Sequence, residues 1–131
     1  MLKHLVLAAA LGLAACADTV EAPVAPTESP LPGSRWVATI GGVHAPTIEF
    51  TENRATGNTG CNNWFGQVTS APPAMTFGAI GTTRRACEQP IMDIERHFLR
   101  VLEETQTASI DGDVLVLSGA NGELARFTRA R

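Results

Sequence analysis

The five cysteine and histidine side chains beyond residue 15 are the first candidates for nucleophilic, redox or metal chemistry: Cys16, Cys61, Cys87, His44 and His97. The two histidines are far apart in the sequence and lack ligand spacing, so neither is expected to bind a metal. No serine stands in a G-x-S-x-G motif, and no glycine-rich loop is followed by the lysine that a phosphate loop needs. The sequence therefore predicts a protein that is not an enzyme and holds no cofactor.

Cys16 follows a segment typical of an export signal. Residues 1–15 place Lys3 before a short apolar run and end in small residues, and this stretch is too short to span a bilayer stably. The run "LAAC" is similar to the bacterial lipobox, in which the signal is removed before the cysteine and its sulfur receives a diacylglycerol. We expect a lipoprotein held to the membrane by lipid on Cys16, with a further acyl chain such as palmitate on the new N-terminus. The alternative is an ordinary secreted protein cut near Ala15.

The residues after the cysteine indicate where the protein would reside. Ala17, rather than aspartate, follows Cys16, which by similarity to bacterial sorting signals favours the outer membrane, facing the periplasm. Residues 16–33 carry four prolines and almost no large apolar residue. This composition predicts a tether that, at ~3.1 Å per residue, holds a domain roughly 50 Å from the lipid. Residues 34–131 then form one small domain.

The charge of the chain argues against nucleic acid as a partner. Lys3 is the only lysine, so removal of the signal leaves nine arginines against thirteen acidic residues, a net charge of −4. Binding to phosphates needs a basic face, which this composition does not offer. The remaining partners are the membrane, through the lipid on Cys16, and an unidentified envelope protein or small ligand.

Cys61 and Cys87 form an even pair if Cys16 carries lipid. In an oxidising compartment such a pair favours a disulfide bond. It would close a loop of about 26 residues, which the loop-entropy relation values at roughly 3–4 kcal/mol. Two alternatives remain at this point: unpaired thiols, and a redox pair, although redox cysteines are usually spaced as C-x-x-C.

Short runs of alternating apolar and polar residues, broken by glycine-rich turns, predict β-strands over much of the domain. In the first run, Trp36, Ala38 and Ile40 are expected to share one face. Asp111-Gly112 and Asn121-Gly122 match type I′ hairpin turns. Residues 108–129 are therefore predicted to form three consecutive antiparallel strands.

In residues 90–104 apolar and polar residues do not alternate; the apolar residues recur every three or four positions. This spacing predicts an amphipathic helix with Pro90 at its first position. Its apolar stripe consists of Ile91, Ile94, Phe98, Val101 and Leu102. The expected fold class is α+β: a curved antiparallel sheet or partial barrel of short strands with one amphipathic helix.

Several motifs together resemble the META domain family, which includes the HslJ-like lipoproteins of bacterial envelopes. The matching elements are Trp36 in a first strand, Gly60-Cys61-Asn62 with Gly66, Thr83 with Cys87, the helix positions Glu95, Phe98, Leu99 and Leu102, and the hairpin from Ile110 to Leu117. The resemblance covers nearly all of residues 34–131 and implies a small α+β domain. Members have been linked to heat response and novobiocin resistance, and the family implies no reaction.

Three functional hypotheses follow. The first is a non-enzymatic, lipid-anchored envelope protein that acts in envelope stress or drug tolerance through an unidentified partner. The second is a periplasmic binding or inhibitor module for a small apolar ligand or a protein. The third, a thiol oxidoreductase using Cys61 or Cys87, has the least support. Trp64 is expected in the core with Trp36, which leaves Asn63 and Phe65 as the candidate binding surface.

Overall fold

The structure, a computed structural model, describes residue 12 and residues 31–131. The predicted signal peptide, apart from Gly12, lies outside the described residues, as do the predicted lipid site Cys16 and the tether up to residue 30. Among the residues that are described, no helix has both the length and the apolar composition needed to cross a membrane.

The described domain consists of nine antiparallel strands, one α-helix and one short 3-10 helix, η1 (Gly42–His44), which confirms the predicted α+β class. The helix is α1 (Gln89–Glu104), and the strands are β1 (Arg35–Ala38), β2 (Thr47–Phe50), β3 (Arg54–Asn58), β4 (Asn63–Ala71), β5 (Ala74–Phe77), β6 (Gly81–Thr82), β7 (Thr107–Asp111), β8 (Val114–Gly119) and β9 (Gly122–Arg129).

The sheet curls until it closes into a barrel. The strand order is β3-β2-β1-β9-β8-β7-β5-β4, and β3 pairs with β4 to complete the ring, while the short β6 pairs with the first part of β4. The closing pair places Gly57 opposite Trp64, whose indole Nε1 donates to the Thr47 carbonyl oxygen at 2.9 Å. A Cβ at position 57 would lie 2.0 Å from that oxygen, so only glycine fits the seam.

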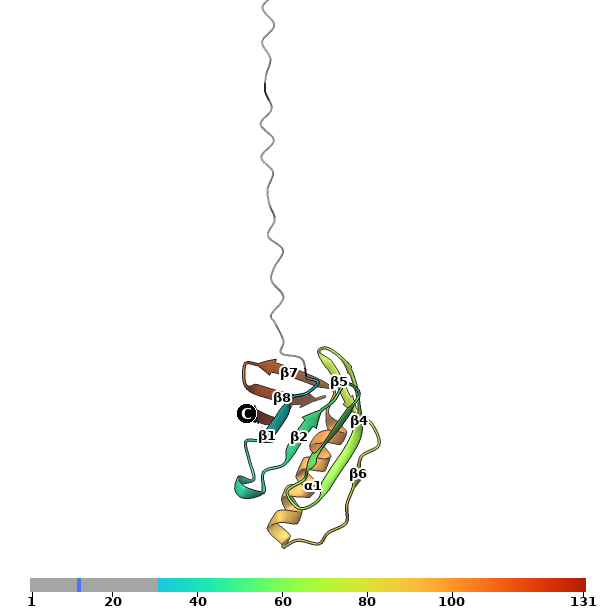
Figure 1. Cartoon of the computed structure of the whole chain (residues 1–131), viewed down its shortest axis with the longest axis vertical. Helices are drawn as coiled ribbons and strands as arrows, with labels where there is room; N and C mark the ends of the chain where they lie inside the picture. The colour runs from blue at the N-terminus through green and yellow to red at the C-terminus, as the bar shows by residue number, and fades with distance from the viewer. Residues whose placement is uncertain (1–11, 13–30) are drawn as a thin grey trace, which may run out of the picture.

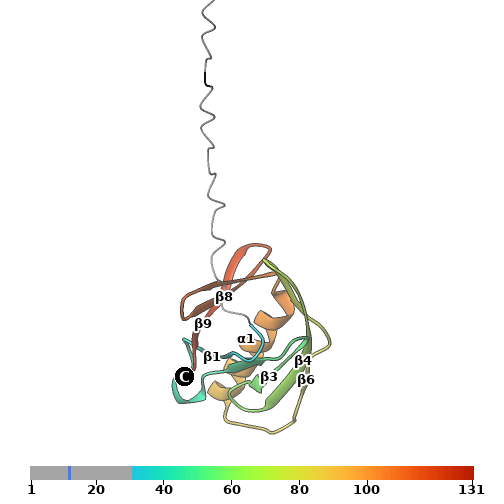
Figure 2. The ribbon, with the colours of Figure 1, turned by 45° about the horizontal axis from the view of Figure 1, so that its top comes forward.

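Helix α1 lies across the inside of this ring (Figure 2) and packs against β5, β8 and β9. It begins at Gln89, one residue before the predicted start, and ends at Glu104 as predicted. Phe98, Val101 and Leu102 from the predicted apolar stripe are buried, whereas Ile91 and Ile94 are half-buried. The helix therefore supplies much of the core that a closed barrel of short strands needs.

Aromatic rings connect the helix to the sheet. The Phe98 ring meets the rings of Trp64 and Phe127 edge to face, with centroids 5.6 and 6.3 Å apart, an arrangement that favours aromatic pairs. Trp64 and Trp36 are both buried, as the sequence indicated. Burial of these large rings, with the aliphatic side chains around them, removes apolar surface from water and stabilises the fold.

Two local predictions were wrong. Ile40 was expected on the face of Trp36 and Ala38, but β1 ends at Ala38 and the Ile40 side chain is 55% exposed, because the chain turns away toward η1. The two hairpins form as predicted but without type I′ turns, which need two residues with positive φ. No non-glycine residue in the described chain has positive φ, and the first loop is Gly112-Asp113 rather than Asp111-Gly112.

Candidate functional site

The turn between β3 and β4 contains the motif Gly60-Cys61-Asn62. Gly60 has a φ of +103°, which L side chains rarely adopt, and a Cβ there would lie 2.7 Å from the His44 carbonyl oxygen. Its backbone N–H donates to Asn58 Oδ1 at 2.7 Å. Glycine is therefore required here both by the backbone angle and by the close approach of the neighbouring loop.

Cys61 and Cys87 form a disulfide, with sulfur atoms 2.01 Å apart and Cα atoms 6.0 Å apart. The bond joins the β3–β4 turn to the segment that enters α1. It is the pairing that the cysteine count favoured over free thiols. Since both sulfurs are bonded to each other, neither is available as a nucleophile in this state.

A buried polar network lies beside the disulfide. The Glu95 carboxylate, on the inner face of α1, accepts hydrogen bonds from the Thr59 hydroxyl and from Asn62 Nδ2, the latter at 2.9 Å. All three residues are buried. Hydrogen bonds to a charged acceptor are stronger than neutral ones, and they offset the cost of taking Glu95 out of water.

Asn62 is the centre of this network. Its Nδ2 also donates to the Arg85 carbonyl oxygen at 3.0 Å, and its Oδ1 accepts from the Thr83 hydroxyl at 3.0 Å and the Arg85 N–H at 2.6 Å. One amide group thus links the turn, the helix and the loop before the helix. The amide of Asn62 is fully used within the domain, so the network fixes this end of the barrel.

The predicted binding surface lies on the outside of β4. Asn63 is exposed, and Phe65 is 49% exposed with its ring lying over Gly81 of β6. The structure brings the two residues to the same outer face of one strand, and neither lines the cavity described below. His44 and His97 are both exposed and lie on different elements, η1 and α1. Across the described residues no metal-binding group of three His, Cys, Asp or Glu side chains forms.

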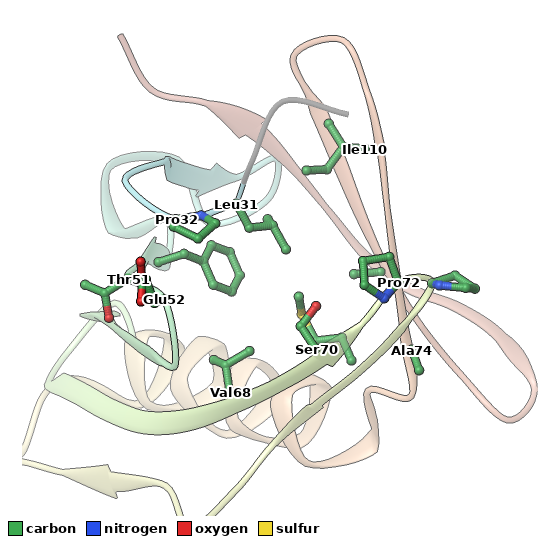
Figure 3. Close-up of a pocket in the computed structure, with 13 residues that line it drawn as sticks. Leu31, Pro32, Thr51, Glu52, Val68, Ser70, Pro72, Ala74 and Ile110 are labelled. Atoms are coloured by element: carbon green, nitrogen blue, oxygen red, sulfur yellow. The ribbon is translucent and has the colours of Figure 1, made fainter. Parts of the chain in front are cut away.

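A cavity that the sequence did not reveal opens at the other end of the barrel, where the strand β4 ends (Figure 3). Its volume is about 310 Å³, and its apolar wall includes Leu31, Phe50, Val68, Met75, Ala108 and Ile110. Phe50 and Met75 belong to the buried core, so the cavity reaches down to the packed interior. It is a hollow end of the barrel interior that α1 does not fill.

The cavity exists because short side chains occupy inward positions near the rim. Along β4 the inward residues Trp64, Gly66 and Val68 are buried, but Ser70, the next inward residue, is exposed into the hollow. Ala108 of β7 is a second short side chain in the wall. Prolines 72 and 73, joined by a cis peptide bond, form the β4–β5 turn at the rim.

The chain enters the domain at this same end (Figure 1). Leu31 packs against the core, and the Gly33 N–H donates to the Phe50 carbonyl oxygen at 2.7 Å. Residues 31–33, assigned from the sequence to the tether, are thus attached to the domain, and Leu31 and Pro32 form part of the cavity wall. Sequence patterns could not indicate this cavity, because strands distant in the chain form it together.

Comparison with known proteins identifies the domain. An NMR structure of a protein from Burkholderia xenovorans aligns with a TM-score of 0.66 at 20% identity, covering 84% of this chain and 97% of that one. A second NMR structure aligns with a TM-score of 0.59, also at 20% identity, covering 73% and 88%. These likenesses show the fold alone. No curated protein matches the chain. A family model for the META domain matches residues 30–131, so the chain belongs to the META domain family.

Proposed function

We propose that this META-domain protein is a non-enzymatic lipoprotein of the cell envelope. In this proposal, lipid on Cys16 anchors it to the outer membrane, facing the periplasm, and the domain supports the envelope under stress or drug exposure through a partner. The observation that carries the proposal is the Cys61–Cys87 disulfide, because structural disulfides persist in oxidising compartments. An exported location also agrees with the signal-like residues 1–15 and the run "LAAC".

The polar groups of the domain support a role without catalysis. The two domain cysteines are bonded to each other, and the buried Glu95 carboxylate is held by Thr59 and Asn62. A catalytic carboxylate or thiol must instead reach a substrate. In this proposal these residues stabilise the domain, and the surface of the domain binds the partner.

Labelling with radioactive palmitate tests the anchor. We expect the wild-type chain to incorporate the label and to sediment with outer membranes, because the lipid would be its only attachment. The Cys16→Ser variant should lose the label and appear in the soluble fraction. A Cys61→Ala, Cys87→Ala variant is the matched control and should still be labelled. Unlabelled wild-type protein, or a Cys16→Ser variant that stays with the membrane, would refute the anchor.

The role in stress is tested with a strain that lacks the gene. We expect greater entry of novobiocin or a dye through its envelope after heat, restored by the wild-type gene but not by Cys16→Ser. Equal permeability in all these strains would contradict the proposed role while leaving the anchor untouched.

The cavity favours a second candidate function: a periplasmic module that binds a small apolar ligand. Its volume of about 310 Å³ lies at the lower end of the roughly 300–1,000 Å³ typical of ligand sites, which are mostly apolar concavities. Titration with 1-octanol, followed by NMR, tests this candidate. Shifts confined to wall residues such as Ser70 and Ala108 are expected, and no saturable shift would reject it.

A further inference from the structure

The wall of the cavity carries charge of one sign. Glu52, in the turn after β2, is the charged residue among those that line it, and no arginine or histidine joins it there. The Glu52 side chain is exposed at the rim, and within residues 31–131 no salt bridge involves it. A ligand head group at the rim would therefore meet a hydrated carboxylate.

We infer that the cavity binds a small hydrophobic amine, with its apolar part inside the barrel and its ammonium group at the rim beside Glu52. The inference rests on the second candidate function and names its ligand class. Burial of the ligand's apolar part against the half-buried wall residues Leu31, Ala108 and Ile110 supplies most of the binding free energy. The ammonium group stays in water, as the ends of lysine side chains do on protein surfaces, so it avoids the cost of burial.

Another polar group at the rim agrees with this ligand class. The Ser70 hydroxyl lies at the cavity and can accept a hydrogen bond from an ammonium group. A fatty acid or another anionic amphiphile would bring its carboxylate toward Glu52 without a cation to receive it. The rim thus distinguishes amphiphiles of equal apolar size by the charge of the head group.

Charge also argues against two other occupants. Residues 17–30 of the same chain contain Asp18, Glu21 and Glu28 and no basic residue, so this segment would bring negative charge to Glu52. A second copy of the protein is likewise acidic, with a net charge of −3 for the whole chain. The carboxylate of Glu52 attracts an amine, whereas it repels both of these acidic occupants.

A matched series of three ligands tests the inference: 1-octylamine, 1-octanol and octanoate, which share one alkyl chain. The chain from Ala17 to Arg131 is titrated with each at pH 7, and amide shifts report binding. The amine should bind about two- to fivefold more tightly than the alcohol, the range expected for an exposed ion pair. Octanoate should bind most weakly, and all shifts should map to wall residues.

Three variants locate the effect. Glu52→Gln should remove the preference for the amine and leave 1-octanol binding unchanged. Ser70→Phe should abolish binding of all three ligands by filling the hollow, whereas Thr69→Phe, on the outer face of the same strand, should bind normally. Ala108→Leu replaces Ser70→Phe if that variant does not fold.

The outcomes separate the two claims. If 1-octanol binds but the amine binds no more tightly, or if Glu52→Gln keeps the preference, the amine inference is overturned and the apolar-ligand function stands. If no ligand binds, both are overturned. Self-association seen by sedimentation, or wall contacts to residues 17–30 seen by NMR, would show another occupant and would also overturn the inference.

Discussion

The two ends of the barrel are built from different interactions. At the disulfide end, the turn before β4 is fixed by the Cys61–Cys87 bond and by the polar network around Asn62. At the cavity end, beyond the last residue of β4, the wall consists mainly of apolar side chains around a hollow of about 310 Å³. One nine-residue strand connects the two ends.

The contrast predicts that substitutions at the two ends affect the stability of the domain differently. Hydrogen bonds and disulfides need defined geometry, so a single substitution at the disulfide end leaves buried polar groups without partners. Apolar contacts are not directional, and the cavity end already lacks full packing, so substitutions there change volume at little cost. The same domain can therefore keep a rigid frame while its open end varies in shape.

The largest expected effect comes from removing the disulfide. The Cys61→Ala, Cys87→Ala variant lacks the cross-link between two residues that are 26 apart in the sequence. Because the cross-link no longer restricts the unfolded chain, the free energy of unfolding should fall by about 3–4 kcal/mol. Urea denaturation followed by circular dichroism measures the change. Wild-type protein treated with a reducing agent should unfold at the same urea concentration as the double variant. An unchanged midpoint would mean that the bond contributes little to this end.

A smaller loss is expected when the polar network is broken. Asn62→Ala leaves the Glu95 carboxylate and the backbone of Arg85 short of partners, which should cost about 2–4 kcal/mol. Asn63→Ala, one residue along and exposed, is the matched control and should stay within about 0.5 kcal/mol of wild type. Equal losses in the two variants would show that burial of the network does not determine stability here.

The smallest effect is expected at the cavity end. Ser70→Leu places an apolar side chain in the hollow and should raise the free energy of unfolding by about 0.5–1 kcal/mol. Thr69→Leu, which faces outward from the same strand, should give no comparable gain. A loss of more than about 1 kcal/mol in Ser70→Leu would indicate overpacking, and the two ends would then be equally intolerant.

Local patterns allowed much of the frame to be predicted. The helix follows from its apolar stripe, and the hairpins at Gly112 and Gly122 follow from turn residues between apolar runs. The type of each turn could not be predicted from these residues, because Asp-Gly and Asn-Gly can occupy a hairpin loop in more than one register. The prediction for Ile40 was wrong because apolar and polar residues continue to alternate in the sequence after Ala38, where β1 ends.

The candidate sites were less accessible from the sequence because they depend on residues distant in the chain. Glu95 looks like an ordinary polar helix residue until Thr59 and Asn62 are placed beside it. Ser70 and Ala108 suggest nothing in isolation, and they form a cavity only because β4 and β7 reach the same end of a closed ring. Burial of a charge and absence of packing are both properties of the assembled barrel.

The pairing of the first strand with the last has a consequence for when the protein can fold. β9 lies between β1 and β8, with Trp36 opposite Arg129 and Ala38 opposite Phe127. The ring cannot close during synthesis until β9 has left the ribosome. Until β9 emerges, the edges of β1 and β8 that it covers in the finished ring have no partner strand, so the nascent domain is exposed to wrong strand pairing for most of its synthesis.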